Sequence, residues 1–372
     1  MKKFSYAAVL FLLVSLTSIA HAREREKNII PWPPNLPVYD HIVIVVEENK
    51  DYEEVIGQNC APYLNKTLKA EGADFVQMYG EEHFSQGNYF WLFSGDNHNV
   101  GFVDTPPEGI PFSTPNLASQ LSEKTPNPLT FKGYAENLPT NHLAPFDEKK
   151  LYARKHVPWV SFDNVPVSCT VDFNEFPKNA DGFKKLPTVS FVIPNLNNDM
   201  HNIPEGGTIE DAVRKGDKWL EENIGPYYDW AKTNNSLLIV TFDENDDKRS
   251  YCGLTNPWFA EFYKNDGKIK RILDPELYED MKNRTITIFA GAHISPGIYK
   301  EERGITHVNI LRTIESMYGL PKAGAQQPNA AGESFVTNDL VVTEEQSLKG
   351  KPLVKKGISD DYIITDVFEY VK

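Results

Sequence analysis

The chain has 372 residues, and its 38 basic and 52 acidic side chains give a formal net charge of -14. An acidic chain is a poor candidate for binding nucleic acid backbones nonspecifically, and one that handles phosphate groups needs a metal ion to reverse the local sign of charge. The length allows one large α/β domain or two smaller ones. No repeat, low-complexity tract or linker divides the sequence, so we predict a single domain over residues 40–372, with 323–372 as a peripheral segment.

Residues 1–22 have the features of a secretory signal peptide. Two lysines precede a short apolar run that ends in Ala-His-Ala, an A-x-A cleavage pattern, and no stop-transfer pattern follows. Cleavage near Ala22 removes both lysines and no acidic residue, so the formal net charge changes from -14 to -16. We therefore expect a secreted or periplasmic protein without a transmembrane segment, in which residues 23–39 form an extended, proline-rich lead-in.

Three cysteines, Cys60, Cys169 and Cys252, are widely spaced along the chain. Their odd number allows one disulfide bond and one free thiol, and the spacing does not select the pair. The oligomeric state is also left open by the sequence.

The predicted elements alternate between strands and helices. Several apolar runs show no polar alternation, which is typical of strands that are buried on both faces of a parallel sheet. This order predicts a doubly wound, mostly parallel sheet with helices on both faces and loop insertions. The predicted strands are 41–46, 74–79, 130–135, 158–162, 188–194, 237–242, 285–289, 339–342 and 362–367, and the predicted helices are 62–71, 88–94, 116–124, 147–155, 208–223, 226–232 and 307–318. Residues 165–186 are predicted to be an irregular insertion, and 258–280 a lid or a peripheral helix.

Metal-binding types of side chain follow three of these strands at the point where each strand ends. The strands are 41–46, 188–194 and 237–242. Because the carboxyl ends of parallel strands meet at one edge of a sheet, we expect these side chains to lie close together. The sequence thus predicts a metal site at this edge. The side chains are Glu48, Asn49, Asp199, His201, Asp243 and Glu244.

Ser85 lies at or just before the start of the predicted helix 88–94. Free backbone N–H groups and the helix dipole favour an anion at such a position. A serine there is most often an N-cap, and the two roles are compatible. His156, which precedes the predicted strand 158–162, is interpreted as a structural histidine.

Common catalytic and metal-binding motifs are absent from the sequence. Residues 243–247 imitate the first half of an EF-hand loop, but Lys248 stands where that loop needs glycine and Leu254 where it needs glutamate. There is no G-x-S-x-G elbow, P-loop, H-E-x-x-H or C-x-x-C motif. The cluster at the strand ends therefore remains the candidate site.

Several separate motifs, in the same order, give this chain a resemblance to the phosphoesterase family. This family contains bacterial and fungal acid phosphatases and bacterial phospholipases C, and it belongs to the alkaline phosphatase superfamily. The resemblance spans residues 40–322. Its motifs are Glu48-Asn49, the run HFSQGNY at 83–89, Asp199-Met-His201, Asp243-Glu244, and the segment 306–321 that begins Thr-His and ends Gly-Leu-Pro.

The resemblance implies a role for each matched residue. Ser85 resembles the nucleophile of the family, with His83 and Asn88 in the same motif as further catalytic residues. The implied ligands of one metal ion are Glu48, Asn49, Asp243 and Glu244, and those of a second are Asp199, His201 and His307. The chain departs from the family pattern at Phe84 and Gly87, where proline is usual, and at Met200, where glycine is usual.

These observations predict a secreted, metal-dependent phosphoric ester hydrolase. The leading hypothesis is a phosphomonoesterase of the acid phosphatase type that forms a phosphoserine intermediate. One alternative is a phosphodiesterase of the phospholipase C type that acts on phospholipid head groups, and another is a metal-stabilised surface binding protein without catalysis. The expected cofactor is one or two divalent ions of magnesium, manganese, calcium or zinc. The expected partner is a small phosphate ester or a phospholipid, with no nucleic acid.

Overall fold

The computed structural model describes residues 36–81, 85–98, 100, 104–107, 109–246, 283–299, 304–324 and 362–369. Its strands are β1 (His41–Glu47), β2 (Ala73–Phe75), β3 (Met78–Tyr79), β4 (Phe131–Ala135), β5 (Thr170–Asp172), β6 (Val189–Ile193), β7 (Ser236–Phe242), β8 (Arg284–Thr285), β9 (Thr287–Gly291), β10 (Gly297–Tyr299) and β11 (Ile305–Thr306). Its α-helices are α2 (Tyr52–Val55), α3 (Lys69–Glu71), α4 (Ser85–Ser94), α5 (Leu117–Glu123), α6 (Ala180–Phe183), α7 (Ile209–Asn223), α8 (Gly225–Ala231) and α11 (His307–Tyr318). The short helices of other types are η1 (Leu64–Leu68), η2 (Arg154–His156), η3 (Pro158–Ser161), η4 (Val167–Cys169) and η5 (Phe173–Glu175).

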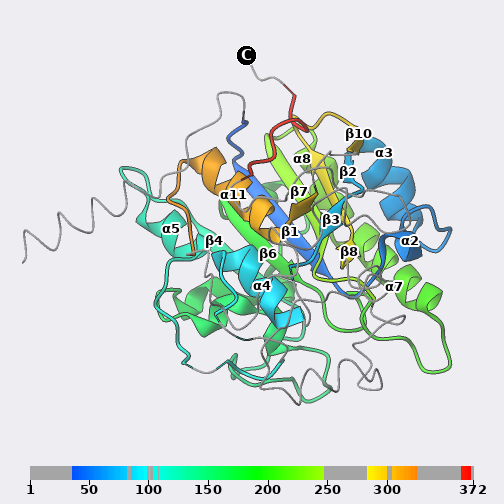
Figure 1. Ribbon diagram of the computed structural model, residues 1–372, viewed down its shortest axis with the longest axis horizontal. Coiled ribbons are helices and arrows are strands. Elements are labelled where there is room, and N and C mark those ends of the chain that lie inside the picture. The colour runs from blue at the N-terminus through cyan, green and yellow to red at the C-terminus, as the bar shows by residue number, and fades with distance from the viewer. Residues whose placement is uncertain are drawn as a thin grey trace, which may run out of the picture.

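The described residues form an eight-stranded sheet in the order β10-β2-β9-β7-β1-β6-β4-β5, and a three-stranded sheet in the order β11-β3-β8. In the large sheet β9 is antiparallel to its neighbours β7 and β2, and the other pairs are parallel. β1 lies between β6 and β7, near the middle of the sheet (Figure 1). The predicted mostly parallel α/β fold is confirmed.

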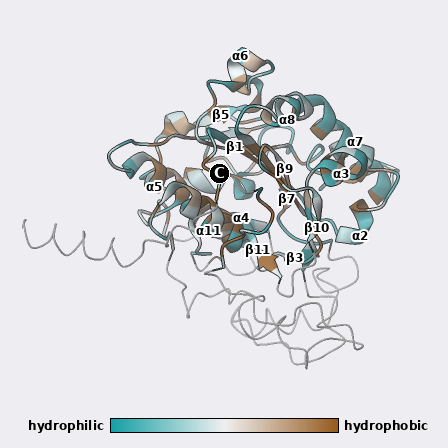
Figure 2. Ribbon diagram, turned by 90° about the horizontal axis from the view of Figure 1, so that it is seen from above, coloured by the Kyte–Doolittle hydropathy of each residue, from teal (hydrophilic) through white to brown (hydrophobic). Residues whose placement is uncertain are grey.

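Helices cover both faces of the large sheet. Figure 2 shows α4, α5 and α11 on one side of the strands and α3, α7 and α8 on the other. Along β1, Ile42, Ile44 and Val46 belong to the apolar cluster on the side of α4 and α11, while Val43 and Val45 belong to the cluster on the side of α7 and α8. The strand reads as an unbroken apolar run because both of its faces are buried.

Most predicted elements are found within a few residues of their expected bounds, and several differ. The predicted strand 74–79 splits into β2 and β3, and the predicted strand 285–289 splits into β8 and β9; in each case the two parts belong to different sheets. The predicted strand 158–162 is the short helix η3, which has a proline in its first turn. The predicted helix 147–155 is mostly a turn because the Asp147 carboxylate accepts backbone N–H groups of Lys149, Leu151 and Tyr152, in competition with helical hydrogen bonds.

Part of the C-terminal segment that was predicted to be peripheral packs on the core. The described residues 362–369 (red in Figure 1) form no strand, although 362–367 was predicted as one. Ile364, Val367 and Phe368 are buried in the cluster beneath α11, so their apolar pattern reflects packing against a helix. The predictions for residues 1–22, 258–280 and 339–342 lie outside the described residues.

Cys60 and Cys169 are free thiols, so they do not pair with one another, and Cys252 lies outside the described residues. Among the helices that the structure describes, none has the length and apolar character needed to span a bilayer. The irregular segment predicted at 165–186 contains only short elements, among which β5 extends the edge of the sheet beside β4.

The loop after β6 is held in place by a close contact with α7. Met200 has a φ of 73° and is fully buried. This left-handed conformation costs energy for a residue other than glycine, which explains why glycine is the usual residue at this position. A Cβ added at Gly216 in α7 would lie 2.4 Å from Met200 Cγ and 2.9 Å from the Asn198 carbonyl oxygen. The glycine in the helix therefore makes room for the methionine in the loop.

We expect Gly216→Ala to destabilise the protein by about 1–3 kcal/mol, because the added methyl group overpacks this contact. Helix propensity alone would predict the opposite effect, because alanine stabilises a helix by about 1 kcal/mol relative to glycine. Urea unfolding followed by circular dichroism measures the difference. Lys218→Ala, at an exposed position of the same helix, is the control and should leave the midpoint nearly unchanged. A Gly216→Ala variant as stable as the parent protein would contradict this account.

Candidate active site

The ends of three adjacent strands, β7, β1 and β6, converge at one edge of the sheet. The Asp243 backbone N–H donates to the Glu47 carbonyl oxygen over 3.0 Å, and the Glu48 N–H donates to the Asp199 carbonyl oxygen over 2.8 Å. These two bonds join the three loops directly after their strands. As a result Glu48, Asp199 and Asp243 lie together although they are far apart in the sequence.

The turn after β1 brings Asn49 against Asp243. Asn49 has a φ of 49°, a left-handed conformation that asparagine tolerates better than most residues. Its backbone N–H donates to Asp243 Oδ1 over 3.1 Å, and the Glu244 N–H donates to the same oxygen over 2.7 Å. Two backbone donors therefore orient the Asp243 carboxylate, and its other oxygen, Oδ2, faces the site.

Ser85 is the first residue of α4, a helix that packs against α11 on one face of the sheet. Its Oγ lies 3.0 Å from Glu244 Oε1 and 3.3 Å from Glu48 Oε2. Lys155 Nζ donates to the same hydroxyl oxygen over 3.3 Å. The serine is 1% exposed, and Asn88, one turn further along α4, is buried as well. The structure thus brings the predicted nucleophile to the predicted ligands.

Glu48 is the most heavily contacted of these carboxylates. Tyr89 donates its hydroxyl to Glu48 Oε1 over 2.7 Å, and His156 Nε2 lies 3.0 Å from the same oxygen. The Tyr89 and His156 rings stack with their centroids 4.9 Å apart. Burial, with Lys155 and His201 nearby, holds the pKa of His156 well below its usual value, so its imidazole is neutral.

Three carboxylate side chains are buried close together in the site. Burial raises the pKa values of Glu48, Asp199 and Asp243, and the charge of Asp243 adds to the shift at Glu48. Lys155 opposes this effect at all three carboxylates. Since like charges in a low-dielectric interior disfavour ionisation of each other, the cluster is stabilised in its charged form only when a cation is added.

The donor set fits a hard divalent cation. Asp243 Oδ2, Asp199 Oδ2 and Asn49 Oδ1 are buried oxygens without a hydrogen-bond partner among the described residues. Such orphaned atoms are rare in folded proteins, and carboxylate and amide oxygens are the ligands that magnesium, calcium and manganese prefer. In the described part of the chain, no three His, Cys, Asp or Glu side chains are arranged as a complete set of metal ligands. The support for a metal site therefore comes from the buried oxygens that have no hydrogen-bond partner.

His201 lies beside Asp199. Its backbone N–H donates to Asp199 Oδ1 over 2.9 Å, and its Nδ1 lies 3.1 Å from Asn202 Oδ1. Burial, with Lys155 nearby, lowers the pKa of His201 to about 4, which leaves its imidazole neutral. The neutral form of histidine is the one that binds metals.

His307, the first residue of α11, lies beside Glu81 and the end of β7. Its Nδ1 lies 2.6 Å from Glu81 Oε2, and its Nε2 lies 2.8 Å from the Phe242 carbonyl oxygen. Burial alone would lower the pKa of His307, but the Glu81 carboxylate outweighs it and raises the pKa. The role of His307 as a ligand of a second metal ion stays a prediction. His83 lies outside the described residues.

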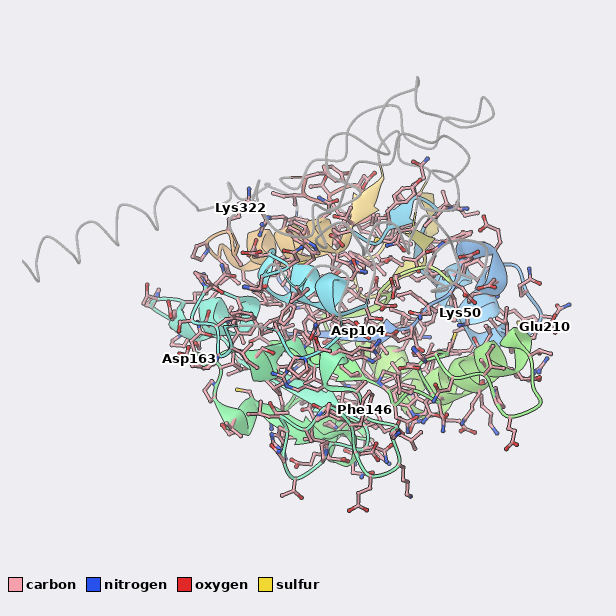
Figure 3. The ribbon with its side chains drawn as sticks, turned by 60° about the horizontal axis from the view of Figure 1, so that its bottom comes forward. Lys50, Asp104, Phe146, Asp163, Glu210 and Lys322 are labelled. Carbon is pink, nitrogen blue, oxygen red and sulfur yellow. The ribbon has the colours of Figure 1, made fainter. Side chains whose placement is uncertain are left out.

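A cavity of about 310 Å³ lies near the site. Its wall includes Gln86, the residue after Ser85, and Lys155, whose Nζ lies 3.3 Å from Ser85 Oγ, together with His201. Asp104 and Phe146, both labelled in Figure 3, line it as well. The cavity therefore offers a place for a substrate beside Lys155.

Sequence reasoning missed three residues of this site: Tyr89, Lys155 and His156. The histidine was interpreted as structural, and the lysine was placed at the end of a helix that does not form. The run Arg-Lys-His at 154–156 was the only local signal. Nothing in the sequence indicated that this run, η2 in the structure, would lie against Glu48 and Ser85.

The fold and the site define a class of enzyme, a hydrolase that acts on phosphoric esters, and comparison with known proteins establishes it. A model of the Phosphoesterase family matches residues 62–321, and the chain belongs to this family. The predicted resemblance is confirmed. Because the family consists of hydrolases, the alternative of a surface binding protein without catalysis is not taken further.

The relatives of the chain carry the names of phosphatases. A phosphatidylinositol-3-phosphatase of Mycobacterium tuberculosis is 40% identical over 289 residues, which cover 78% of this chain and 80% of that protein. An acid phosphatase of Aspergillus fumigatus is 24% identical over 343 residues, which cover 85% of this chain and 66% of that protein. Among solved structures, a protein in the alkaline phosphatase superfamily from Vibrio parahaemolyticus matches with a TM-score of 0.49 and 17% identity, covering 86% of this chain and 77% of that one.

Proposed function

We propose that this protein is a secreted, metal-dependent phosphomonoesterase that acts through a phosphoserine intermediate on Ser85. The observation that carries the proposal is the position of the Ser85 hydroxyl, 3.0 Å from Glu244 and 3.3 Å from Glu48, at the first residue of a buried helix. Lys155, which contacts this hydroxyl, lines a cavity. Secretion is supported by the signal sequence pattern at residues 1–22.

The first half of the reaction transfers the phosphoryl group to the serine. Ser85 Oγ attacks phosphorus, the Oγ–P bond forms, and the P–O bond to the alcohol breaks. The hydroxyl proton passes to Glu244, which accepts the hydrogen bond of Ser85 in the structure. Glu244 releases this proton to solvent, and the departing alkoxide takes up a proton from solvent. The N-terminus of α4 favours the negative charge of the phosphoryl group.

The second half restores the enzyme. Water attacks the phosphorus of phosphoserine, the Oγ–P bond breaks, and inorganic phosphate leaves while Ser85 regains a proton. A divalent ion held by Glu48, Asn49, Asp243 and Glu244 would supply charge that lowers the pKa of the serine hydroxyl and neutralises the phosphoryl oxygens. Asp199, His201 and His307 are the candidates for holding a second ion.

A monoester substrate is favoured over a phospholipid diester. The two relatives described above are both named as phosphatases. A phospholipase C would also need an apolar entrance, and Trp91 and Phe93, two aromatic side chains of α4, are buried in the core. The exposed Phe146 is the aromatic side chain that lines the cavity.

Ser85→Ala should lower kcat by about three orders of magnitude or more, since the nucleophile is lost. The measurement is the steady-state hydrolysis of p-nitrophenyl phosphate, with circular dichroism to show that the fold is intact. Ser94→Ala, which changes another buried serine of α4, is the matched control and should retain activity. Turnover by Ser85→Ala at the parent rate would rule out the phosphoserine mechanism.

Removal of divalent metal by a chelator should abolish activity and lower the melting temperature, because an ion that binds only the folded state stabilises it. Adding back magnesium, manganese, calcium or zinc one at a time should restore both properties with the native ion. Asp243→Asn is the comparison variant, and its melting temperature should respond less to added metal. Full activity in a metal-free preparation, verified by elemental analysis, would refute the metal dependence.

Hydrolysis of p-nitrophenyl phosphate should exceed that of p-nitrophenyl phosphorylcholine by at least about tenfold in kcat/KM, a difference of about 1.4 kcal/mol in transition-state binding. Both esters release the same chromophore, so one assay compares them directly. The opposite preference would instead support the phospholipase C type of phosphodiesterase.

A further inference from the structure

Lys155 directs its charged group at the nucleophile. It is the middle residue of η2, and its Nζ lies 3.3 Å from Ser85 Oγ and 2.8 Å from Asp104 Oδ2. Its side chain is 15% exposed and forms part of the cavity wall. The family resemblance assigned no role to this residue.

The neighbours of Lys155 in η2 are engaged elsewhere. Arg154 donates from its guanidinium to Ser161 Oγ over 3.0 Å, which ties it to η3. His156 lies against Glu48 and stacks on Tyr89. Lys50, another cation near the carboxylates, donates to the Asn49 carbonyl oxygen over 2.6 Å. Within the described part of the chain, Lys155 is thus the lysine whose ammonium group contacts the attacking oxygen.

We propose that Lys155 is a catalytic residue that binds the phosphoryl group as it is transferred to Ser85, and that Asp104 positions its ammonium group before the substrate arrives. This inference rests on the proposed function. A phosphorus atom bonded to Ser85 Oγ brings its other oxygens within reach of a group that already contacts Oγ. Lysine binds phosphate as a compact point charge, and the bond is strengthened when both partners are charged.

Asp104 makes the ammonium group available to a substrate. Its side chain is 32% exposed, and it lines the same cavity as Lys155. Its other oxygen accepts the backbone N–H of Gln86 over 3.3 Å, so the carboxylate is anchored at the start of α4. A phosphate monoester, which carries two negative charges, can compete with this single carboxylate for the lysine. A phosphodiester carries one negative charge and competes less well.

Lys155 therefore favours monoesters over diesters. Its fixed positive charge interacts more strongly with the dianionic phosphoryl group of a monoester than with the monoanionic group of a diester. A lysine that only supported the fold would affect the hydrolysis of both esters alike. The ratio of the two activities is thus the property that separates a catalytic from a structural role.

The test compares Lys155→Met, which removes the charge at similar size, with Lys155→Arg, which keeps it. Lys155→Met should lower kcat/KM for p-nitrophenyl phosphate by about 10²–10³-fold, as loss of a group that stabilises transition-state charge does. The loss for bis-p-nitrophenyl phosphate should be at least about tenfold smaller, and Lys155→Arg should recover part of the monoester activity. Lys149→Ala, which removes an exposed lysine near η2, is the control for long-range charge and should stay within about twofold of the parent enzyme.

Asp104→Asn gives an independent readout, the inhibition constant of inorganic phosphate. If the lysine serves the substrate, removal of the competing carboxylate should tighten phosphate binding several-fold, whereas Lys155→Met should weaken it. If the ion pair is only structural, both variants should lose stability and neither should change the affinity for phosphate. If Lys155→Met does not fold, two other measurements test the role of Lys155. They are the inhibition constant of phosphate for Asp104→Asn, and the ratio of monoester to diester hydrolysis for Lys155→Arg.

Two results would overturn the inference: parent activity on both esters in Lys155→Met, or an equal loss on both with unchanged phosphate inhibition. Failure of the proposed function itself is distinguishable, because an active Ser85→Ala enzyme removes the phosphoserine mechanism whatever Lys155 does. An inactive Ser85→Ala enzyme together with a fully active Lys155→Met enzyme would reject the lysine alone.

Discussion

The parallel pairing of β7, β1 and β6 is the constraint on which the site depends. Parallel strands end at the same edge of a sheet. Here two backbone hydrogen bonds, from Asp243 to Glu47 and from Glu48 to Asp199, also connect the loops that follow the strands. The carboxylates cannot separate without breaking these bonds. The apolar side chains on both faces of β1 stabilise the sheet that holds the carboxylates together.

Such an arrangement is unfavourable unless positive charge compensates it. Burial raises the pKa values of Glu48, Asp199 and Asp243; the charges of Asp243 and Asp199 raise that of Glu48 further, and the charge of Asp243 raises that of Asp199. Lys155 supplies part of the compensation, and the orphaned oxygens indicate where a metal ion would supply more. The same charges suit a phosphoryl transfer, in which the enzyme mainly positions the reactants and stabilises negative charge.

Access to the site depends on the segments around the sheet. The cavity beside Lys155 is walled by residues from the start of α4, from η2 and from the loop after β6. That loop is held by Met200, which takes a strained conformation and packs into the space left by Gly216. Gly216 in α7 thus makes room for Met200, and Asp199 and His201 lie beside the other strand ends.

The large sheet and the convergence of its central strands were predictable from the sequence, because long apolar runs followed at once by acidic residues are typical of strands that are buried on both faces and end at a site. Helices α7 and α11 were predictable as well, since their capping residues and glycine stop are local signals. Three other features emerge only from the folded chain: η2 lies against Glu48 and Ser85, His307 lies against Glu81, and the Asp147 side chain replaces a predicted helix with a turn. Those outcomes depend on contacts between residues far apart in the chain, or on a side chain competing for backbone N–H groups, and neither leaves a periodic pattern in the sequence.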